Sequence, residues 1–549
     1  MAAAIVPYGK LDEAEQERLM ARRKTRRRMT IMGISWIVLA GVVVAAVVGS
    51  SQTKAVCSST LYPDSCYNSL APLVKSRNLM PQDLYKLSVQ VAIDQVAKAS
   101  KNFAMLNITD DPRTTAALRS CEELFDLALD HLNSSLSIKS TKISEAFDDL
   151  RTWLSSAGTY QQTCIDELEI SASSRSFHLD ESFKNSTEYT SNSLAIISSF
   201  GEFKGRGRRR LMSTTHDHPE WVSSEDRKLL QAPVNSSIVK ADAVVAKDGS
   251  GMYKTIGDAL KDVPDKSKKR FVIYVKKGVY VENVRVDKSK WNVMMIGDGK
   301  DATIVSSSLN VVDGTPTFQS ATFAVFGQGF MARDMGFTNT AGASKHQAVA
   351  LMSTADLSVF HRCSMDAFQD TLYAHSNRQF YRECNIYGTV DFIFGNSAAV
   401  MQNCNILPKK PMPGQQNTIT AQGRLDPNQN TGLSIQNCTI WPSANLTGVS
   451  TFLGRPWKNY STTVYLQNVM NGFIDPKGWL PWVGTSAPDT IFYAEFQNSG
   501  PGALPKNRVA WKGLMLNLTA SQVKKFTVAQ FINGDKWIPT TGVTYKSGI

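Results

Sequence analysis

A recurring interval of 21 or 22 residues in the C-terminal half limits the fold of this chain more than any other feature. Three pairs of identical residues show it: Gln347 and Gln369, Cys363 and Cys384, and Asp370 and Asp391. Such an interval is typical of one coil of a β-solenoid, in which neighbouring strands stack about 4.7–4.9 Å apart. A full-coil interval places Asp370 beside Asp391, with Gln369 next to them and Gln347 one coil below. The Cα spacing between adjacent coils also falls within the range that a disulfide tolerates.

Short strand-like runs dominate the chain from residue 238 to its end. They occupy residues 271–275, 292–296, 348–351 and 390–394, and Gly, Asn or Asp closes them without regular helical spacers. This pattern predicts an all-β domain. The segment holds 32 Lys and Arg against 21 Asp and Glu, which gives +11 of the whole chain's net charge of +12. An acidic polysaccharide would suit such a charge.

The paired carboxylates Asp370 and Asp391 indicate acid–base and nucleophilic chemistry. Two carboxylates within a few ångströms cannot both ionise freely, so one stays protonated while the other is an anion. Arg455 offers a bidentate cation that holds one carboxylate charged. The two Gln side chains supply N–H donors for a developing oxyanion. Together these groups describe acyl transfer at an ester, although paired carboxylates alone would equally describe a glycosidase.

Residues 51–200 show helical periodicity. Apolar residues recur at steps of three and four along 118–132 and 143–168, and more weakly along 84–96. These stripes are typical of amphipathic helices that pack into a bundle. Because no constellation of titratable side chains stands out here, we expect binding rather than catalysis from this region.

Five motifs in the C-terminal segment resemble, in order, the signatures of the pectin methylesterase family. They are G-M-Y-K-T at 251–255, Q-A-V-A-L at 347–351, Q-D-T-L-Y at 369–373, G-T-V-D-F-I-F-G-N at 388–396 and L-G-R-P-W at 453–457. The resemblance covers most of residues 238–540 and implies a right-handed parallel β-helix that hydrolyses methyl esters of homogalacturonan. Residues 51–200 resemble the plant invertase and pectin methylesterase inhibitor family in their pattern and cysteine spacing, which implies a four-helix bundle. The chain is therefore expected to be multidomain.

The resemblance also implies roles for individual residues. Asp391 is expected to be the nucleophile, oriented by Arg455, and Asp370 to protonate the departing methanol and then activate water. Gln347 and Gln369 are expected to stabilise the oxyanion. The residues expected to contact substrate are Thr317, Gln347, Phe394, Arg455 and Trp457. No metal or other cofactor is expected, because the histidines show no metal-ligand spacing and no dinucleotide or phosphate-binding motif is present.

A basic flank followed by an uncharged apolar run marks the N-terminus. Seven Arg and Lys residues lie between positions 18 and 28, and residues 31–49 carry no charge. The run is near the length that spans a bilayer, and the flank would keep residues 1–30 cytosolic. We therefore expect a membrane signal anchor at 31–50, with the remainder in the lumen. A cleaved signal peptide ending near residues 46–51 is the alternative.

Cysteines and glycosylation sequons agree with a secretory route to the cell wall. All eight cysteines follow the apolar run, where disulfides are expected; Cys57 and Cys66 could close a hairpin, and Cys121 and Cys164 could join two helices. The remaining disulfide candidates are Cys363, Cys384, Cys404 and Cys438. The sequons are at Asn107, Asn133, Asn185, Asn235, Asn437, Asn445, Asn459 and Asn517.

Residues 201–237 form a polar, basic linker between the predicted domains at 51–200 and 238–549. Exposed segments of this composition are where proteases cut, so we expect a processing protease to separate the domains here. The candidate sites are Arg208, Arg209, Arg210, Leu211 and Met212, and Arg227, Lys228, Leu229 and Leu230.

Two other functional classes remain open. A polygalacturonase or lyase with a β-helix would shorten the polymer instead of releasing methanol, and a non-catalytic protein would only bind the wall. A serine hydrolase is disfavoured because no G-X-S-X-G run is present. The partners expected are methylesterified pectin and, for the helical region, an inhibitor-type contact within the chain or with another molecule. No nucleic-acid partner is expected.

Overall fold

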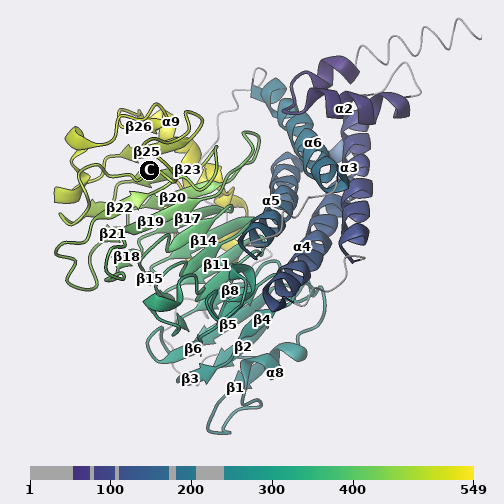
Figure 1. Ribbon diagram of the computed structural model, residues 1–549. Coiled ribbons are helices and arrows are strands. Elements are labelled where there is room, and N and C mark those ends of the chain that lie inside the picture. Colours follow the sequence, from purple (N-terminus) through teal and green to yellow (C-terminus); the bar gives the residue numbers. More distant parts are fainter. Residues whose placement is uncertain (1–52, 75–79, 105–110, 172–180, 206–239) are drawn as a thin grey trace, which may run out of the picture.

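The computed structural model describes residues 53–74, 80–104, 111–171, 181–205 and 240–549, which form a helical bundle and a parallel β-helix (Figure 1). The predicted anchor at 31–50, the predicted processing motifs, and the sequons Asn107 and Asn235 lie outside these residues. Within the described ranges, no helix is long and apolar enough to cross a membrane.

Four long helices form the bundle: α3 (Pro81–Ala104), α4 (Pro112–Ser137), α5 (Phe147–Ser171) and α6 (Glu181–Gly205). Contacts connect α3 with α4, α4 with α5, α5 with α6, and α6 with α3. The start of α4 shows a local cause of helix formation, because the Asp111 side chain accepts hydrogen bonds from the backbone N–H groups of Arg113 and Thr114. The apolar stripe predicted along 118–132 is buried in the bundle core. The predicted four-helix bundle is thus confirmed.

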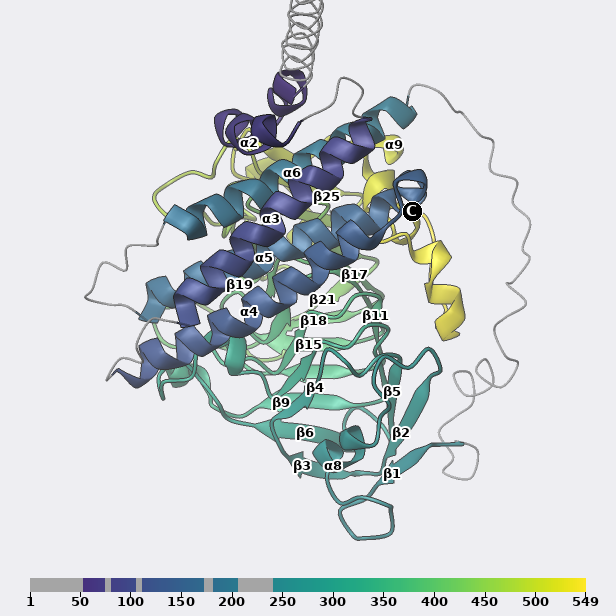
Figure 2. The ribbon, with the colours of Figure 1, turned by 90° about the vertical axis from the view of Figure 1, so that its right-hand side faces the viewer.

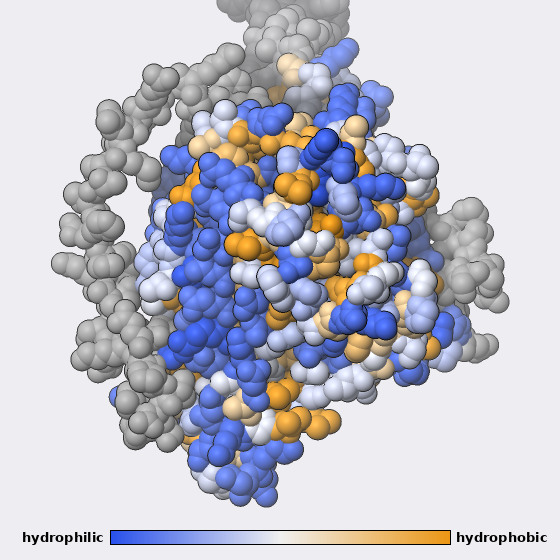
Figure 3. All heavy atoms as spheres, turned by 90° about the vertical axis from the view of Figure 1, so that its left-hand side faces the viewer, coloured by the Kyte–Doolittle hydropathy of each residue, from blue (hydrophilic) through white to orange (hydrophobic). Residues whose placement is uncertain are grey.

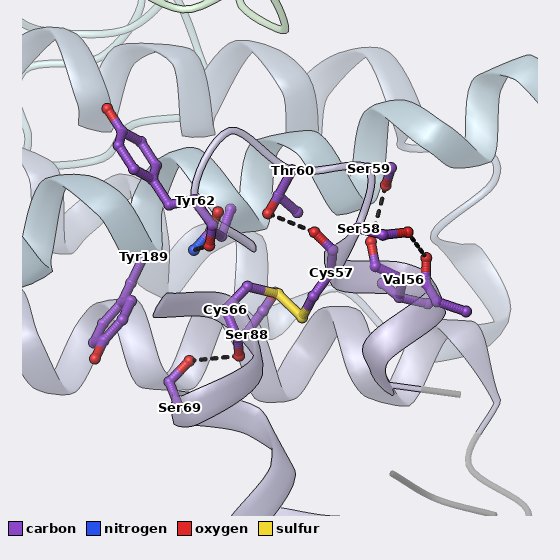
Figure 4. Close-up of a disulfide and its surroundings, with 12 residues drawn as sticks. Val56, Cys57, Ser58, Ser59, Thr60, Tyr62, Cys66, Ser69, Ser88 and Tyr189 are labelled. Carbon is purple, nitrogen blue, oxygen red and sulfur yellow. Dashed lines mark hydrogen bonds between the residues drawn. A yellow bond between two sulfur atoms is a disulfide. The ribbon is translucent and has the colours of Figure 1, made fainter. Parts of the chain in front are cut away.

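Two disulfides link parts of the helical region. Cys121 on α4 bonds to Cys164 on α5, with their Cα atoms 4.7 Å apart. Cys57 bonds to Cys66 in the short helix α2 (Pro63–Leu70), with a Cα separation of 5.5 Å (Figure 4). Both pairings suggested by the sequence are confirmed.

Three sheets of parallel strands form the β-helix. The 11-stranded sheet contains β1 (Ala243–Val245), β2 (Phe271–Val275), β5 (Val293–Gly297), β8 (Met331–Arg333), β11 (Ser358–His361), β14 (Arg378–Arg382), β17 (Ala398–Gln402), β20 (Gly432–Gln436), β23 (Thr462–Leu466), β25 (Phe492–Phe496) and β26 (Leu514–Met515). The eight-stranded sheet contains β3 (Gly278–Val281), β6 (Thr303–Ser307), β9 (Gly336–Asn339), β12 (Ser364–Asp366), β15 (Asn385–Gly388), β18 (Asn405–Pro408), β21 (Thr439–Ile440) and β24 (Val469–Met470). The seven-stranded sheet contains β4 (Val284–Val286), β7 (Phe323–Val325), β10 (Leu351–Ser353), β13 (Leu372–Ala374), β16 (Ile393–Gly395), β19 (Asn417–Gln422) and β22 (Thr451–Gly454).

Two successive coils each have the length of the interval that recurs in the sequence. Leu351 pairs with Leu372, and Leu372 pairs with Ile393, so these two steps along the seven-stranded sheet are equally long. Each equals the separation of Asp370 from Asp391 in the sequence. The next step is longer, because Ile393 pairs with Thr420. Loops between strands therefore vary in length while the strands stay in register, and the predicted solenoid is confirmed without a uniform repeat.

Four of the predicted disulfide candidates are wrong. Cys363, Cys384, Cys404 and Cys438 are free thiols buried in the core of the β-helix. They occupy equivalent positions on successive coils; the backbone N–H of Cys384, for example, lies 3.4 Å from Cys404 Sγ. In-register parallel strands direct such side chains the same way, which keeps neighbouring Cβ atoms near the strand spacing and above the mean Cβ separation of a disulfide, about 3.8 Å. A Cα spacing within the disulfide range therefore does not by itself predict a disulfide between adjacent coils.

The bundle packs on the outer face of the seven-stranded sheet. Figure 2 shows α3, α4, α5 and α6 in front of the β-helix. Apolar residues of the bundle and outward-facing residues of this sheet, such as Met352, Tyr373 and Phe394, belong to one hydrophobic cluster. On the face turned away from the bundle, hydrophilic and hydrophobic side chains are interspersed (Figure 3). The seven-stranded sheet is thus the surface that joins the two domains.

Candidate active site

Asp370 and Asp391 lie side by side at the start of neighbouring strands. Each stands two residues before its strand, β13 or β16, and these strands pair Leu372 with Ile393. Both aspartates adopt left-handed backbone conformations, with φ of 63° and 53°. This conformation is uncommon for non-glycine residues but is several-fold enriched in Asp. The adjacency predicted from the recurring interval is therefore confirmed.

Asp391 is held by donors from two further coils. Arg455, which follows β22, donates from Nε to Oδ1 at 2.8 Å and from Nη2 to Oδ2 at 2.6 Å. The hydroxyl of Thr418 on β19 donates to Oδ1 at 2.6 Å. A bidentate guanidinium contact fixes the orientation of a carboxylate and stabilises its negative charge. The Asp391 carboxyl is thus held in one orientation by the Arg455 guanidinium, the contact that the sequence predicted.

Asp370 has the opposite electrostatic environment. Burial raises the pKa of its carboxyl well above the ordinary value, and the negative charge of Asp391 raises it further. The Arg455 guanidinium opposes this rise without cancelling it. Two neighbouring carboxyls with different pKa values can divide the roles of acid and anion.

The predicted glutamines and substrate-contact residues gather around the carboxylates. Gln347 and Gln369 form a parallel bridge on adjacent coils, and the N–H of Ala348 donates to the Gln369 carbonyl oxygen. A cavity of about 180 Å³ is lined by Gln347, Gln369, Asp370, Asp391 and Arg455 together with Thr317, Phe394 and Trp457. The structure therefore brings every predicted catalytic and substrate-contact residue to one place.

Aromatic rings form one wall of this cavity. Tyr373 stacks on Phe394 with ring centroids 4.1 Å apart, and Phe394 lies 6.2 Å from Trp457. Trp482 lies 6.4 Å from Trp457, and the Arg455 guanidinium sits 4.3 Å from the Trp482 ring centroid. Flat apolar faces beside polar donors suit a sugar ring.

Comparison with known proteins agrees with this geometry. The family described as Pectinesterase matches residues 242–535, more than half of the chain. The chain belongs to the pectinesterase family. The family described as Plant invertase/pectin methylesterase inhibitor matches residues 51–196 of this pectinesterase.

Relatives match over nearly the whole chain. A putative pectinesterase/pectinesterase inhibitor 24 of Arabidopsis thaliana is 53% identical, over 99% of this chain and 100% of the relative. Pectinesterase 3 of Phaseolus vulgaris is 50% identical, over 91% and 87%. The solved structure of pectin methylesterase from carrot has a TM-score of 0.56 and 51% identity, and covers 57% of this chain and 100% of its own. Carboxylic ester hydrolysis is thus the activity class of this pectinesterase.

Helix α5 of the bundle lies over the active site. The cavity that Asp370 and Asp391 line is also lined by four residues of this helix: Thr163, Asp166, Glu167 and Ile170. Asp166 Oδ1 accepts from Lys458 Nζ at 2.6 Å. Glu167 Oε1 accepts from the backbone N–H of Phe318 at 3.0 Å, and burial raises the pKa of Glu167 to about 7. Contact between the inhibitor-like region and the enzyme within one chain is therefore observed.

A buried polar network extends this contact beyond the cavity. Tyr160 on α5 accepts from Asn377 Nδ2 at 3.1 Å, and Ser156 Oγ donates to Asn377 Oδ1 at 2.9 Å. The Thr163 hydroxyl lies 2.8 Å from Nε2 of His375. Hydrogen bonds between buried partners require a specific relative position of the two domains.

Sequence reasoning assigned no role to four residues of the site. Tyr373 ends the third of the five motifs and faces outward by strand alternation, a signal that could have identified it. Trp482 lies outside the helices and strands, where no periodicity marks it. Asp166 and Glu167 carry no signal in the sequence, because the helical region shows no titratable constellation by itself. Their partners come from the other domain.

Proposed function

We propose that this pectinesterase removes methyl esters from homogalacturonan through an acyl-enzyme formed on Asp391, and that α5 restrains it by occupying the cleft. The observation that carries the proposal is the bidentate Arg455–Asp391 contact beside a buried Asp370 whose pKa is raised. An oriented anion and a protonated acid at one cavity match the two groups that this reaction needs.

The first step forms the acyl-enzyme. An Asp391 oxygen attacks the ester carbonyl carbon, and the resulting oxyanion accepts hydrogen bonds from the side-chain amides of Gln347 and Gln369. When the bond to the methoxy group breaks, Asp370 gives its proton to that oxygen and methanol leaves. An anhydride now joins Asp391 to the galacturonate carbonyl.

The second step restores the enzyme. Asp370, now an anion, takes a proton from water, and the resulting hydroxide equivalent attacks the galacturonate carbonyl. The bond to Asp391 breaks, which gives a galacturonic acid group and an Asp391 carboxylate paired again with Arg455. The product acid then loses its proton to solvent and becomes a carboxylate. Asp370 ends protonated, as it began.

The experiment follows methanol release and polymer length together on highly methylated pectin, with residues 238–549. Methanol without shortening is expected, and Asp391→Asn should reduce its rate by at least about 10³-fold. Asp366→Asn is the matched control, because Asp366 is a half-exposed carboxylate on β12 that pairs with Lys409. Polymer shortening would instead identify a glycosidase or lyase, and binding without either product a non-catalytic wall protein.

Restraint by the helical region is tested with the full chain. Because α5 residues line the catalytic cavity, the full chain should release methanol more slowly than residues 238–549 at equal concentration. Equal rates would contradict the proposed restraint while leaving the esterase mechanism intact.

We also propose that the precursor enters the secretory pathway through residues 31–50 and is cut at 208–212 or 227–230 before the enzyme reaches the cell wall. Six sequons fall in the described residues, and five of them have exposed Asn side chains: Asn133, Asn437, Asn445, Asn459 and Asn517. Asn185 is half-buried on α6. Carbonate extraction of membranes, N-terminal sequencing of the wall-bound protein and a glycosidase gel shift test the anchor, the cut and the glycans.

A further inference from the structure

A second cavity lies where the bundle meets the C-terminal end of the β-helix. It has a volume of about 480 Å³ and shares no lining residue with the catalytic cavity. Its walls come from the first turn of α5, from the loop after β19, and from the 3-10 helix η7 (Lys524–Phe526) with the short helix α10 (Val528–Phe531). Both domains therefore contribute to it.

Positive charge is concentrated in this cavity. Arg151 of α5, Arg424 of the loop after β19 and Lys525 of η7 line it, and Asp148 is the lining carboxylate, which leaves a net charge of +2. Burial and the charge of Arg151 together lower the pKa of Arg424 to about 10. Burial likewise lowers the pKa of Arg151 and of Lys525. The two arginines thus lose hydration, and Arg424 repels both Arg151 and Lys525.

These cations find mainly backbone partners. Arg424 donates from Nε to the Asp426 carbonyl oxygen at 3.1 Å and from Nη2 to the Pro427 carbonyl oxygen. Arg151 donates from Nη2 to the Asn428 carbonyl oxygen at 3.0 Å. Within the described ranges, its Nε is buried without a hydrogen-bond partner. The charges of Asp148 and Asp426 act on Arg151 and Arg424, but no carboxylate of the residues that the structure describes forms an ion pair with either guanidinium. Buried guanidinium groups without such a contact favour the binding of an anion.

Aromatic side chains stand beside the cations. Lys525 Nζ lies 4.6 Å from the centroid of the Phe492 ring and 5.1 Å from that of Phe526. Tyr460 and Phe531 complete the aromatic lining. Cations combined with flat apolar rings match a sugar that carries a carboxylate, because the rings face its C–H surface and the cations its charge.

We propose that this cavity is a second binding site, for a galacturonate unit of demethylated pectin. The identity of the sugar rests on the proposed function, since hydrolysis of the methyl ester creates this carboxylate. A ligand that contacts Arg151 on the bundle and Arg424 on the β-helix stabilises the docked arrangement, because separation of the two domains destroys its site. The reaction product would then hold the helical region in place.

Calorimetric titration of the full chain with fully demethylated trigalacturonate tests the site, with inorganic phosphate as a second ligand. Trigalacturonate is expected to bind, and Arg151→Gln and Lys525→Gln are each expected to weaken it by at least about tenfold. Lys525 is an exposed residue, so its replacement keeps the test valid if Arg151→Gln impairs folding. Arg119→Gln, which removes an exposed charge from α4, is the matched control and should bind as the parent does.

Three results would overturn the proposal. They are no binding of trigalacturonate, binding by Arg151→Gln and Lys525→Gln as tight as that of the parent, and phosphate binding as tight as that of the sugar. The last result would indicate an unselective cationic surface. Trp457→Ala replaces a residue that lines the catalytic cavity and not this one, and should retain the binding that Arg151→Gln and Lys525→Gln weaken. Because the titration needs no turnover, its failure is distinguishable from failure of the esterase, which methanol release by residues 238–549 measures separately.

Discussion

Replacing Glu167 by Gln should remove a large part of the pH dependence of docking between the helical region and the enzyme. Burial raises the pKa of Glu167 from 4.5 to about 7, although the backbone N–H of Phe318 opposes the rise. An acid whose pKa is higher when docked binds its proton more tightly there, so docking is strongest below pH 4.5 and weakens as the pH rises toward 7. At 1.36 kcal/mol for each pH unit, the difference is about 3 kcal/mol, or roughly 300-fold in the opening equilibrium. Gln is neutral throughout and retains the acceptor oxygen for Phe318.

Hydrogen exchange of the Phe318 amide in the full chain measures this opening directly, because that N–H donates to Glu167 only in the docked state. After correction for intrinsic exchange, the free energy of opening between pH 4.5 and 8 should fall by about 3 kcal/mol more in the parent than in Glu167→Gln. Glu169→Gln, an exposed position on the same helix, should follow the parent. Identical pH profiles for the parent and Glu167→Gln would refute the argument that burial of this carboxyl controls docking.

Three further changes test the site and the fold. Arg455→Lys replaces the bidentate contact to Asp391 with a single point of charge, and should lower kcat for methanol release by roughly 10- to 100-fold. The pair Cys121→Ser and Cys164→Ser opens a link across 43 residues and should lower the free energy of unfolding of the bundle in urea by about 4 kcal/mol. Gly395→Ala should lower the free energy of unfolding of the β-helix in urea by more than about 2 kcal/mol, since the φ of Gly395 is 121° and an added Cβ would lie 2.1 Å from a backbone oxygen. Gly257→Ala is the control: an added Cβ there makes only ordinary contacts, so the free energy of unfolding should hardly change.

The sequence predicted that Asp370 and Asp391 are neighbours because that part of the β-helix is regular. The coil from Leu351 to Leu372 is as long as the coil from Leu372 to Ile393, so residues separated by this interval become neighbours. The regularity ends with the next coil, and Arg455 reaches Asp391 from 64 residues away. The pairing of Arg455 with Asp391 could therefore be predicted from the chemistry of a guanidinium and from the family resemblance, but not from the distance between the two residues in the sequence.

The free thiols show where spacing alone misleads. Cys363 and Cys384 are one coil apart, as a disulfide between neighbouring strands would need, yet both are free. Whether two cysteines on adjacent coils can form a disulfide depends on the direction of their side chains, and the register of the strands sets that direction. Cys121 and Cys164 differ because they lie on separate helices of the bundle, whose packing brings their sulfur atoms together.

Amino-acid patterns by themselves determined the helical stripes, the stacked strands and the adjacency of Asp370 and Asp391, because each depends on contacts within one helix or between adjacent coils. Only the tertiary structure decided that α5 covers the cleft, that Glu167 is buried against Phe318, and that Arg151 meets Arg424 at a shared cavity. These contacts join residues more than 150 positions apart across two domains. The helical pattern of the bundle and the strand pattern of the β-helix would be the same without these contacts. The contacts depend on the complementary shapes and charges of two folded surfaces, which no local sequence pattern encodes.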